Sequence, residues 1–325
     1  MIKTESGIKA GNFFIRSKAV LAPLAGVTDY PMRSLIREYS PYPLLTAEMI
    51  SSEALVMNSG TLITYTDKKE APVSWQISGH KPEITAKAAK ILEPKASLID
   101  INMGCPVKKI VNGSDGCALM KTPELAQNIV RAVKEAVSIP VACKFRLGWS
   151  LENTNFIEFA QKMQEAGASL VTIHARYRSQ MYSGSADWKA LSDLRGNIDI
   201  PYIANGDITS PEKAQECLEI TKADGIAIGR AAMGDLSLIA RVHKYLDEGI
   251  LLPEPDLKEK ISMLKKHLDA EIAFRGLDSG IKFFRKFYPH YIKNIKGSSE
   301  YRRILITELD YSRINEILDG IIKNG

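Results

Sequence analysis

Eight short apolar runs alternate with longer amphipathic segments between residues 18 and 240 of the chain. The runs are nearly continuous in apolar residues, which is typical of parallel strands that are buried on both faces. The segments between the runs are long enough for the crossover connections that parallel strands need. The alternation therefore predicts an α/β fold built from repeated βα units. The predicted strands are residues 19–23, 44–47, 73–77, 98–102, 141–146, 170–174, 202–204 and 225–228.

The segments between the strands carry residues that are typical of helix starts. Thr122 and Ser210 are predicted N-caps, and Pro123 and Pro211 follow them in the first helical turn. An open doubly wound sheet is the alternative, but no G-x-G-x-x-G pattern follows the first strand. Eight βα units in succession favour a closed (β/α)8 barrel, the TIM barrel. The predicted helices include residues 82–92, 123–137, 153–165 and 211–218.

The pattern changes at residues 251–255, where two prolines within three residues mark a linker or a sharp turn. No strand pattern follows this point. Residues 257–274, 278–296 and 300–323 instead carry apolar residues at helical spacing. We therefore expect a barrel domain of residues 1–250 and a small all-helical domain of residues 251–325.

Cysteine usage and hydropathy exclude several classes of protein. The chain has 325 residues, and its four cysteines form no CxxC pair and are accompanied by five histidines. We therefore expect neither a metal site nor a disulfide framework. No run of 18 apolar residues predicts a membrane span, and residues 1–5 lack the pattern of a signal peptide. A reducing cytoplasm is the expected compartment.

Polar residues occur where the predicted strands end. Active sites of (β/α)8 barrels lie at the carboxyl ends of the strands, so these residues are candidates for chemistry. Lys144 lies within an apolar run and needs an anion, a cofactor or an interior ion-pair partner to offset its burial. His174 ends the sixth strand, either as a site residue or as a hydrogen-bonded core histidine. The other candidates are Gln76, Asn102, Arg146, Asn205, Gly206, Asp207, Gly229 and Arg230.

The loops after strands seven and eight have the composition of a phosphate site. Many barrels of this kind bind phosphate at these two loops. Gly206 and Gly229 allow backbone N–H groups to approach a phosphate closely, and Arg230 adds a charge-assisted contact. Each loop alone has a common pattern, but the placement of both favours phosphate binding.

Cys105 differs in its context from Cys117, Cys143 and Cys217, because it lies between a glycine and a proline at the end of a strand. A free cysteine is usually a small buried apolar residue, which is our interpretation of the other three. A thiol with an ordinary pKa of about 8.5 is mostly protonated at neutral pH. Cys105 is therefore suited to act as a general acid. Neither a Ser-His-Asp arrangement nor an HExxH motif points to hydrolysis.

Five of these segments together resemble the tRNA-dihydrouridine synthase family, and most of all its bacterial B-type subgroup. The resemblance covers residues 18–320, and Asn-Met-Gly-Cys-Pro at 102–106 is its most specific motif. Leu24 stands where methionine is frequent, and Ala175 and Tyr177 stand where glycine and threonine are frequent, but no chemical group is lost. The segments are residues 22–29 (APLAGVTD), 100–106 (DINMGCP), 144–149 (KFRLGW), 203–208 (IANGDI) and 228–232 (IGRAA).

The resemblance implies FMN as the cofactor and NADPH as the usual reductant. It places the catalytic acid on Cys105 and Asn102 near the uracil ring. The implied reaction is reduction of the C5=C6 bond of a tRNA uridine, with a hydride from FMN to C6 and a proton from Cys105 to C5. The residues with implied FMN-binding roles are Pro23, Leu24, Ala25, Gln76, Lys144, His174, Asn205, Gly206, Asp207, Gly229 and Arg230.

A basic window in the predicted helical domain offers a place for RNA. Residues 282–303 contain seven Lys or Arg and one acid, Glu300, so this window carries a charge of +6. Such a charge suits a phosphate backbone, and Arg285 and Lys286 are the predicted tRNA contacts within the window. Arg176 and Arg178, near the predicted barrel mouth, would continue this track of positive charge along the RNA. The alternative is a helix with a core side and a solvated side, which would place most of the interleaved aromatic residues in the core.

Two other functions remain open on the sequence. A dihydroorotate dehydrogenase, which acts on a free pyrimidine, also uses a Cys-Pro loop over FMN, but a free base needs no phosphate track. A non-catalytic flavoprotein or RNA-binding protein is disfavoured because all the predicted chemical groups are present. We expect a monomer.

Overall fold

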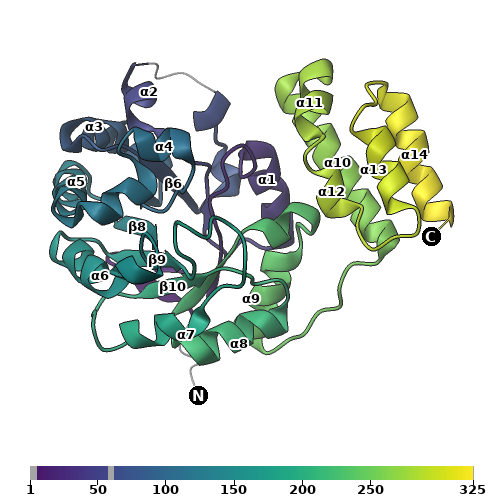
Figure 1. Cartoon of the computed structure of the whole chain (residues 1–325). Coiled ribbons are helices and arrows are strands. Elements are labelled where there is room, and N and C mark those ends of the chain that lie inside the picture. Colours follow the sequence, from purple (N-terminus) through teal and green to yellow (C-terminus); the bar gives the residue numbers. More distant parts are fainter. Residues whose placement is uncertain (1–5, 58–61, 325) are drawn as a thin grey trace.

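Within residues 6–57 and 62–324, which the computed structural model describes, eight parallel strands close into a barrel (Figure 1). Residues 1–5, considered above as an N-terminal segment, lie outside the described residues, as do 58–61 and 325. Successive strands pair in order, and the last pairs with the first through Ile228 and Leu21. The predicted (β/α)8 barrel is therefore confirmed. Its strands are β3 (Ala19–Leu21), β4 (Leu45–Thr46), β6 (Val73–Ser78), β7 (Leu98–Asn102), β8 (Val141–Arg146), β9 (Leu170–His174), β10 (Tyr202–Asn205) and β11 (Gly225–Ile228).

Helices form the outer layer of the barrel. Ser210 caps its helix as predicted, because its side chain accepts a hydrogen bond from the N–H of Lys213. Thr122 occupies the N-cap position of α5, but its side chain makes no capping hydrogen bond. The predicted helix at 153–165 begins later, at Phe156, because residues 151–153 form a separate 3-10 turn. The main helices are α1 (Tyr30–Tyr39), α3 (Pro82–Leu92), α5 (Pro123–Ala136), α6 (Phe156–Glu165), α8 (Pro211–Thr221) and α9 (Leu238–Glu248).

The barrel interior changes from apolar at its amino-terminal end to polar at its carboxyl-terminal end. A hairpin of β1 (Ile8–Ala10) and β2 (Phe13–Ile15), which the sequence analysis did not predict, packs Ile8 and Ile15 against the apolar end. Side chains alternate along each strand, so Leu98, Asp100 and Asn102 lie at successive levels of the interior. The polar groups of the interior are thus concentrated at the carboxyl ends of the strands.

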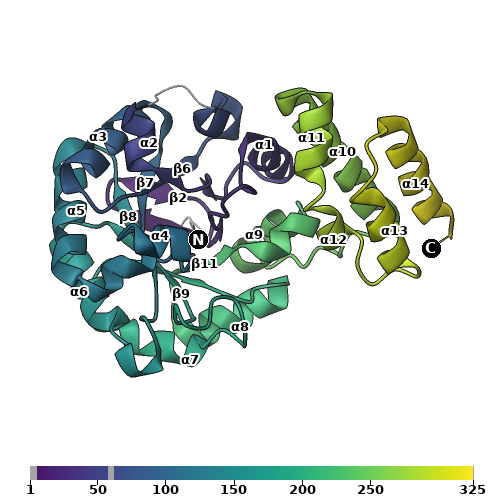
Figure 2. The same cartoon turned by 45° about the horizontal axis from the view of Figure 1, so that its top comes forward.

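The chain after residue 256 folds into a helical region beside the barrel, next to α1 and α9 in both views (Figures 1 and 2). The predicted continuous helix at 278–296 is wrong, because Pro289 lacks an N–H and cannot continue the preceding helix. The predicted helix at 300–323 is also interrupted, by residues 306–310. The helices are α10 (Leu257–Arg275), α11 (Leu277–Phe284), α12 (Tyr288–Tyr291), α13 (Ser298–Leu305) and α14 (Tyr311–Asn324).

Aromatic residues from the basic window form the core of this helical region. Phe284, Phe287, Tyr288 and Tyr291 are buried, as the core-side interpretation of the window predicts. The region contacts the barrel closely at Gly234, where an added Cβ would lie 2.2 Å from the carbonyl oxygen of His290. None of the described helices is both long enough and apolar enough to cross a membrane.

Candidate active site

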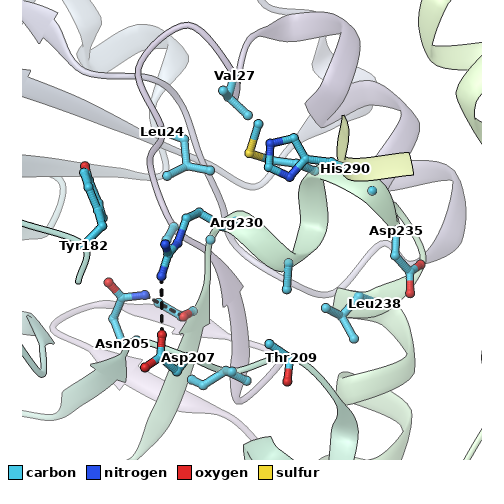
Figure 3. Close-up of a pocket in the computed structure, with 18 of the residues that line it drawn as sticks. Leu24, Val27, Tyr182, Asn205, Asp207, Thr209, Arg230, Asp235, Leu238 and His290 are labelled. Carbon is cyan, nitrogen blue, oxygen red and sulfur yellow. Dashed lines mark hydrogen bonds and ion pairs between the residues drawn. The ribbon is translucent and has the colours of Figure 1, made fainter. Parts of the chain in front are cut away.

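A cavity of about 1330 Å³ opens at the carboxyl ends of the barrel strands and extends to the helical region. Figure 3 shows part of its wall, where Arg230 reaches toward Asp207 with Leu24, Tyr182 and Asn205 nearby. The barrel fold brings together here all the residues predicted for the cofactor, the acid and the uracil. They are Pro23, Leu24, Ala25, Gln76, Asn102, Cys105, Lys144, His174, Asn205, Gly206, Asp207, Gly229 and Arg230.

Lys144 presents an ammonium group to the cavity from the middle of β8. Its Nζ donates a hydrogen bond to Oδ1 of Asn205 at 3.0 Å. Burial, together with the nearby Arg146, lowers the pKa of Lys144 to about 8. Among the described residues no carboxylate lies within 4.0 Å of this Nζ, so the interior ion pair considered above does not form. The geometry instead leaves N–H donors of Lys144 for a group in the cavity.

A chain of side-chain amides positions the loop that carries Cys105. Gln76 Nε2 donates to Oδ2 of Asp100 at 2.7 Å, and Asn102 Nδ2 donates to Oε1 of Gln76 at 2.8 Å. The Oδ1 atom of Asn102 then accepts the backbone N–H groups of Gly104 at 3.2 Å and Cys105 at 2.9 Å. Asn102 therefore fixes the backbone on which the thiol sits while itself lining the cavity.

Arg146 also binds the backbone of the loop that carries Cys105. Its Nε donates to the carbonyl oxygen of Gly104 at 2.8 Å, and its Nη1 donates to those of Tyr177 and Met181. Burial raises the pKa of the Cys105 thiol, although Arg146 opposes the shift. The thiol is therefore protonated at neutral pH, as a general acid must be.

The other three cysteines, Cys117, Cys143 and Cys217, are fully buried and lie outside the cavity. Burial raises the pKa of all three thiols. This agrees with their interpretation as small apolar residues and leaves Cys105 as the thiol that faces the cavity.

His174 lies in the cavity wall beside a buried guanidinium. Its Nε2 is 3.3 Å from Nη1 of Arg176. Burial, with the cations Lys144 and Arg146, holds the pKa of His174 well below its usual value, so its ring is neutral at neutral pH. A neutral imidazole can donate or accept a hydrogen bond within the cavity without adding a charge.

Arg176 was predicted to contact tRNA, and the structure places it elsewhere. The residue is only 1% exposed, and its Nη2 forms an ion pair with Oδ2 of Asp207 at 2.7 Å. It also donates to the carbonyl oxygens of Ser183 and Gly184. The guanidinium is therefore used inside the protein, where it orients Asp207 and His174, and is not available to a phosphate.

The two glycine loops meet at one end of the cavity. Gly206 has a φ of +124°, and an added Cβ would lie 2.9 Å from the Cβ of Ala186, so a side chain is excluded there. Asp207 Oδ1 lies 3.4 Å from Nη2 of Arg230, whose side chain is 49% exposed. Asp207 thus holds two arginines, and Arg230 turns an accessible guanidinium toward the cavity.

The remaining predicted tRNA contacts lie outside the cavity. Arg178 stacks on the ring of Trp149, and Arg285 donates to the carbonyl oxygen of Thr307 at 3.4 Å. Lys286 is half-buried and donates to the carbonyl oxygen of Gly26 in the barrel. The sequence analysis assigned no individual role to five residues that line the cavity. They are Arg146, Tyr182, Lys260, Lys293 and Lys296.

Three of these five residues had a sequence signal. Lys293 and Lys296 belong to the basic window, whose charge was recognised but whose individual members were not ranked. Arg146 was noted at the end of a strand without a role. Tyr182 lies in the loop after β9 and gave no signal, because its approach to Arg146 and Arg230 depends on the course of that loop.

Comparison with known proteins decides the family. The family model described as dihydrouridine synthase matches residues 20–320 of the chain. The chain belongs to the dihydrouridine synthase family. It is therefore a flavin-dependent oxidoreductase, and the resemblance stated from the motifs is confirmed.

Curated members of this family match the chain over nearly its whole length. A probable tRNA-dihydrouridine synthase from Rickettsia bellii (strain RML369-C) is 38% identical over 301 residues, which cover 91% of each chain. The tRNA-dihydrouridine synthase B of Vibrio vulnificus (strain CMCP6) is 37% identical over 320 residues, which cover 98% of this chain and 99% of the relative. The similarity thus includes the helical region as well as the barrel.

Solved structures of more distant proteins share the barrel. A 2-naphthoyl-CoA reductase in complex with 2-naphthoyl-CoA superposes with a TM-score of 0.59 at 11% identity, covering 76% of this chain and 53% of the other. An old yellow enzyme homologue from Zymomonas mobilis superposes with a TM-score of 0.54 at 14% identity, covering 79% of this chain and 95% of the other. At these identities the likeness shows the fold alone.

Proposed function

We propose that the chain is a tRNA-dihydrouridine synthase that uses FMN and NADPH to reduce the C5=C6 bond of specific uridines in tRNA. The observation that carries this proposal is the position of Cys105. Its thiol lines the same cavity as Lys144, the two glycine loops and Arg230. A proton donor and a site for an anionic, phosphate-bearing cofactor are therefore within one chamber.

The residues of the cavity fit FMN. Among the described residues Asn205 is the one hydrogen-bond acceptor of Lys144, so the other ammonium protons suit the electron-rich edge of a flavin ring. Arg230 suits the phosphate, because its accessible guanidinium lies beside the two glycine loops, where Gly229 has no side chain to cover its backbone. The cavity volume of about 1330 Å³ exceeds the roughly 300–1,000 Å³ of common small-molecule sites. It thus leaves room for a second ring beside the flavin.

The chemistry that bound FMN would supply is the transfer of a hydride, obtained from NADPH, to C6 of the uracil ring. Cys105 would give the proton that C5 requires, because its thiol is neutral at the pH of the cell. Asn102 and Arg146 would hold the thiol at a fixed place by binding the backbone of its loop. Lys144 would stabilise negative charge that builds up opposite the thiol.

The cations at the outer part of the cavity favour tRNA over a free pyrimidine. Lys260, Lys293 and Lys296 belong to the helical region and line the same cavity as Cys105. They suit the phosphates on either side of a uridine that has left its stack. A dihydroorotate dehydrogenase would have no use for them. We therefore propose residues 1–250 as the FMN-binding catalytic domain and 251–325 as the tRNA-binding domain of a monomer in the cytoplasm.

The test combines cofactor analysis with nucleoside mapping. We expect the purified protein to be yellow and to convert uridine to dihydrouridine in tRNA taken from a strain that lacks this gene. The Cys105→Ala variant should keep bound flavin and lose most conversion. Oxidation of dihydroorotate without activity on tRNA would instead favour the free-pyrimidine enzyme. A colourless protein that does not take up FMN would refute both readings.

A further inference from the structure

A cluster of buried charges joins the helical region to the barrel. Arg275 in α10 donates through Nε to Oε2 of Glu271 at 2.7 Å and through Nη2 to Oδ2 of Asp29. Asp29 is 4% exposed, and its Oδ1 accepts the N–H of Met32, so the same carboxylate caps α1 of the barrel. One guanidinium therefore binds two buried carboxylates, one from each part of the molecule.

Lys286 crosses the same interface beside this cluster. Its Nζ donates a hydrogen bond to the carbonyl oxygen of Gly26 and lies 3.1 Å from the centroid of the Phe283 ring. Arg275 lies over the same ring, with its Cζ 3.6 Å from the centroid. The ammonium group is thus held between an aromatic ring of the helical region and a carbonyl oxygen of the barrel.

Gly26 is held from two sides by charged groups. Its N–H donates to Oε2 of Glu48 at 2.6 Å, and its carbonyl oxygen accepts from Lys286. Its φ of +68° lies in the left-handed region, where the chain makes a sharp turn. The residues just before this turn, Pro23–Ala25, line the cavity, as does Met49 next to Glu48. The conformation of the cofactor-binding loop is therefore fixed partly by a side chain from the helical region.

We propose that Lys286 is a positioning residue for the flavin site, which couples docking of the helical region to cofactor binding through Gly26. This rests on the proposed function, since it assumes that FMN binds against Pro23–Ala25. It also gives Lys286 a different role from the tRNA contact predicted from its charge. Because coupling between two events is reciprocal, bound FMN should also stabilise the docked helical region.

The variant Lys286→Met tests the proposal, because methionine has an unbranched apolar side chain and lacks the ammonium donor. Losing a charge-assisted hydrogen bond should raise the Kd for FMN by about tenfold or more, measured by titrating apoprotein with FMN. Lys286→Arg should recover much of the affinity. Lys282→Met is the matched control, since Lys282 is exposed on α11, one turn earlier, and its variant should bind FMN as the wild type does.

Hydrogen exchange on the unmodified protein gives a second, independent measurement. FMN should slow amide exchange in α10 and α11 of the wild type, although these helices contribute few residues to the cavity. Equal FMN affinity in Lys286→Met and wild type, or FMN protection confined to the barrel, would overturn the proposal. A wild type that binds no FMN would instead refute the proposed function, so the two failures are distinguishable.

Discussion

Replacing Cys105 with alanine removes the proposed acid without disturbing its support. The loop is held by backbone contacts, namely the hydrogen bonds from the N–H groups of Gly104 and Cys105 to Asn102 and from Arg146 to the carbonyl oxygen of Gly104. The sulfur atom takes part in none of these contacts, and the backbone of Val107 is its one hydrogen-bond partner among the described residues. We therefore expect Cys105→Ala to fold and to bind FMN with unchanged affinity.

The size of the expected effect follows from the task of the thiol. A positioned general acid contributes about 10²- to 10⁴-fold to a rate, so the variant should convert uridine that much more slowly. The assay is a single turnover of enzyme first reduced with NADPH, mixed with tRNA and quenched for mass spectrometry of dihydrouridine. Reoxidation of the flavin, followed by absorbance, reports hydride transfer in the same sample.

The pH dependence of that turnover gives a sharper test. An ordinary thiol with a pKa of about 8.5 is about 97% protonated at pH 7. Burial raises the pKa of Cys105 further, so the active, protonated form persists to higher pH and is lost only as pH rises through the raised value. Lys144, whose pKa is about 8, also loses its charge in this range, so the informative quantity is the ratio of the wild-type rate to the Cys105→Ala rate. We expect this ratio to be flat from pH 6 to beyond 8.5 and to decline at higher pH. A ratio that increases with pH, or Cys105→Ala at the wild-type rate, would refute the acid role.

Three further variants probe the cavity, the interface with the helical region and the proposed RNA contacts. Lys144→Met should weaken FMN binding about tenfold in a titration, because a hydrogen-bond donor to the cofactor is lost. It should also raise the thermal midpoint of the apoprotein, because a desolvated ammonium group is removed. Unchanged FMN affinity would place the cofactor elsewhere. Arg275→Met should lower the free energy of unfolding by about 3 kcal/mol, since it leaves two buried carboxylates unpaired. Burial raises the pKa of Asp29 to about 6 and also raises that of Glu271, so this loss should be larger at pH 8 than at pH 5, and a pH-independent loss would contradict the pairing. Lys293→Gln combined with Lys296→Gln should weaken tRNA binding and reduce its salt dependence by about two ions, with FMN affinity as the control; an unchanged salt slope would remove both lysines from the track.

The barrel was predictable because two features of the sequence mark each of its strands. Each strand is an apolar run, and each is followed by a polar or glycine residue that a buried strand alone would not need. Once the order of strands is known, closure brings Asn102, Lys144 and Asn205 into one chamber, whatever the details of the loops. The family motifs fall on these strand ends, so pattern and resemblance gave the same site.

The charged residues near the mouth were not predictable in the same way. Sequence shows that Arg176, Lys286 and Lys293 are cations, but not what faces them. Arg176 follows a strand whose neighbour supplies Asp207, and the ammonium group of Lys286 donates to Gly26, so both charges are used inside the protein. Lys293 lies after α12 and faces the cavity. Such differences depend on tertiary neighbours, which a charge count over residues 282–303 does not contain.

The segment from Pro23 to Asp29 connects the cavity residues of the barrel with the charged residues of the helical region. Its first part lines the cavity, whereas Gly26 and Asp29 bind Lys286 and Arg275 of the helical region. The loop is short and internally hydrogen-bonded, since the N–H groups of Val27 and Thr28 both donate to the carbonyl oxygen of Leu24. A shift at Asp29 or Gly26 would therefore move Leu24. Substitutions in the helical region can for this reason alter the proposed flavin site across the interface. Loss of activity in such a variant therefore identifies an RNA contact only when the FMN affinity of the variant is unchanged.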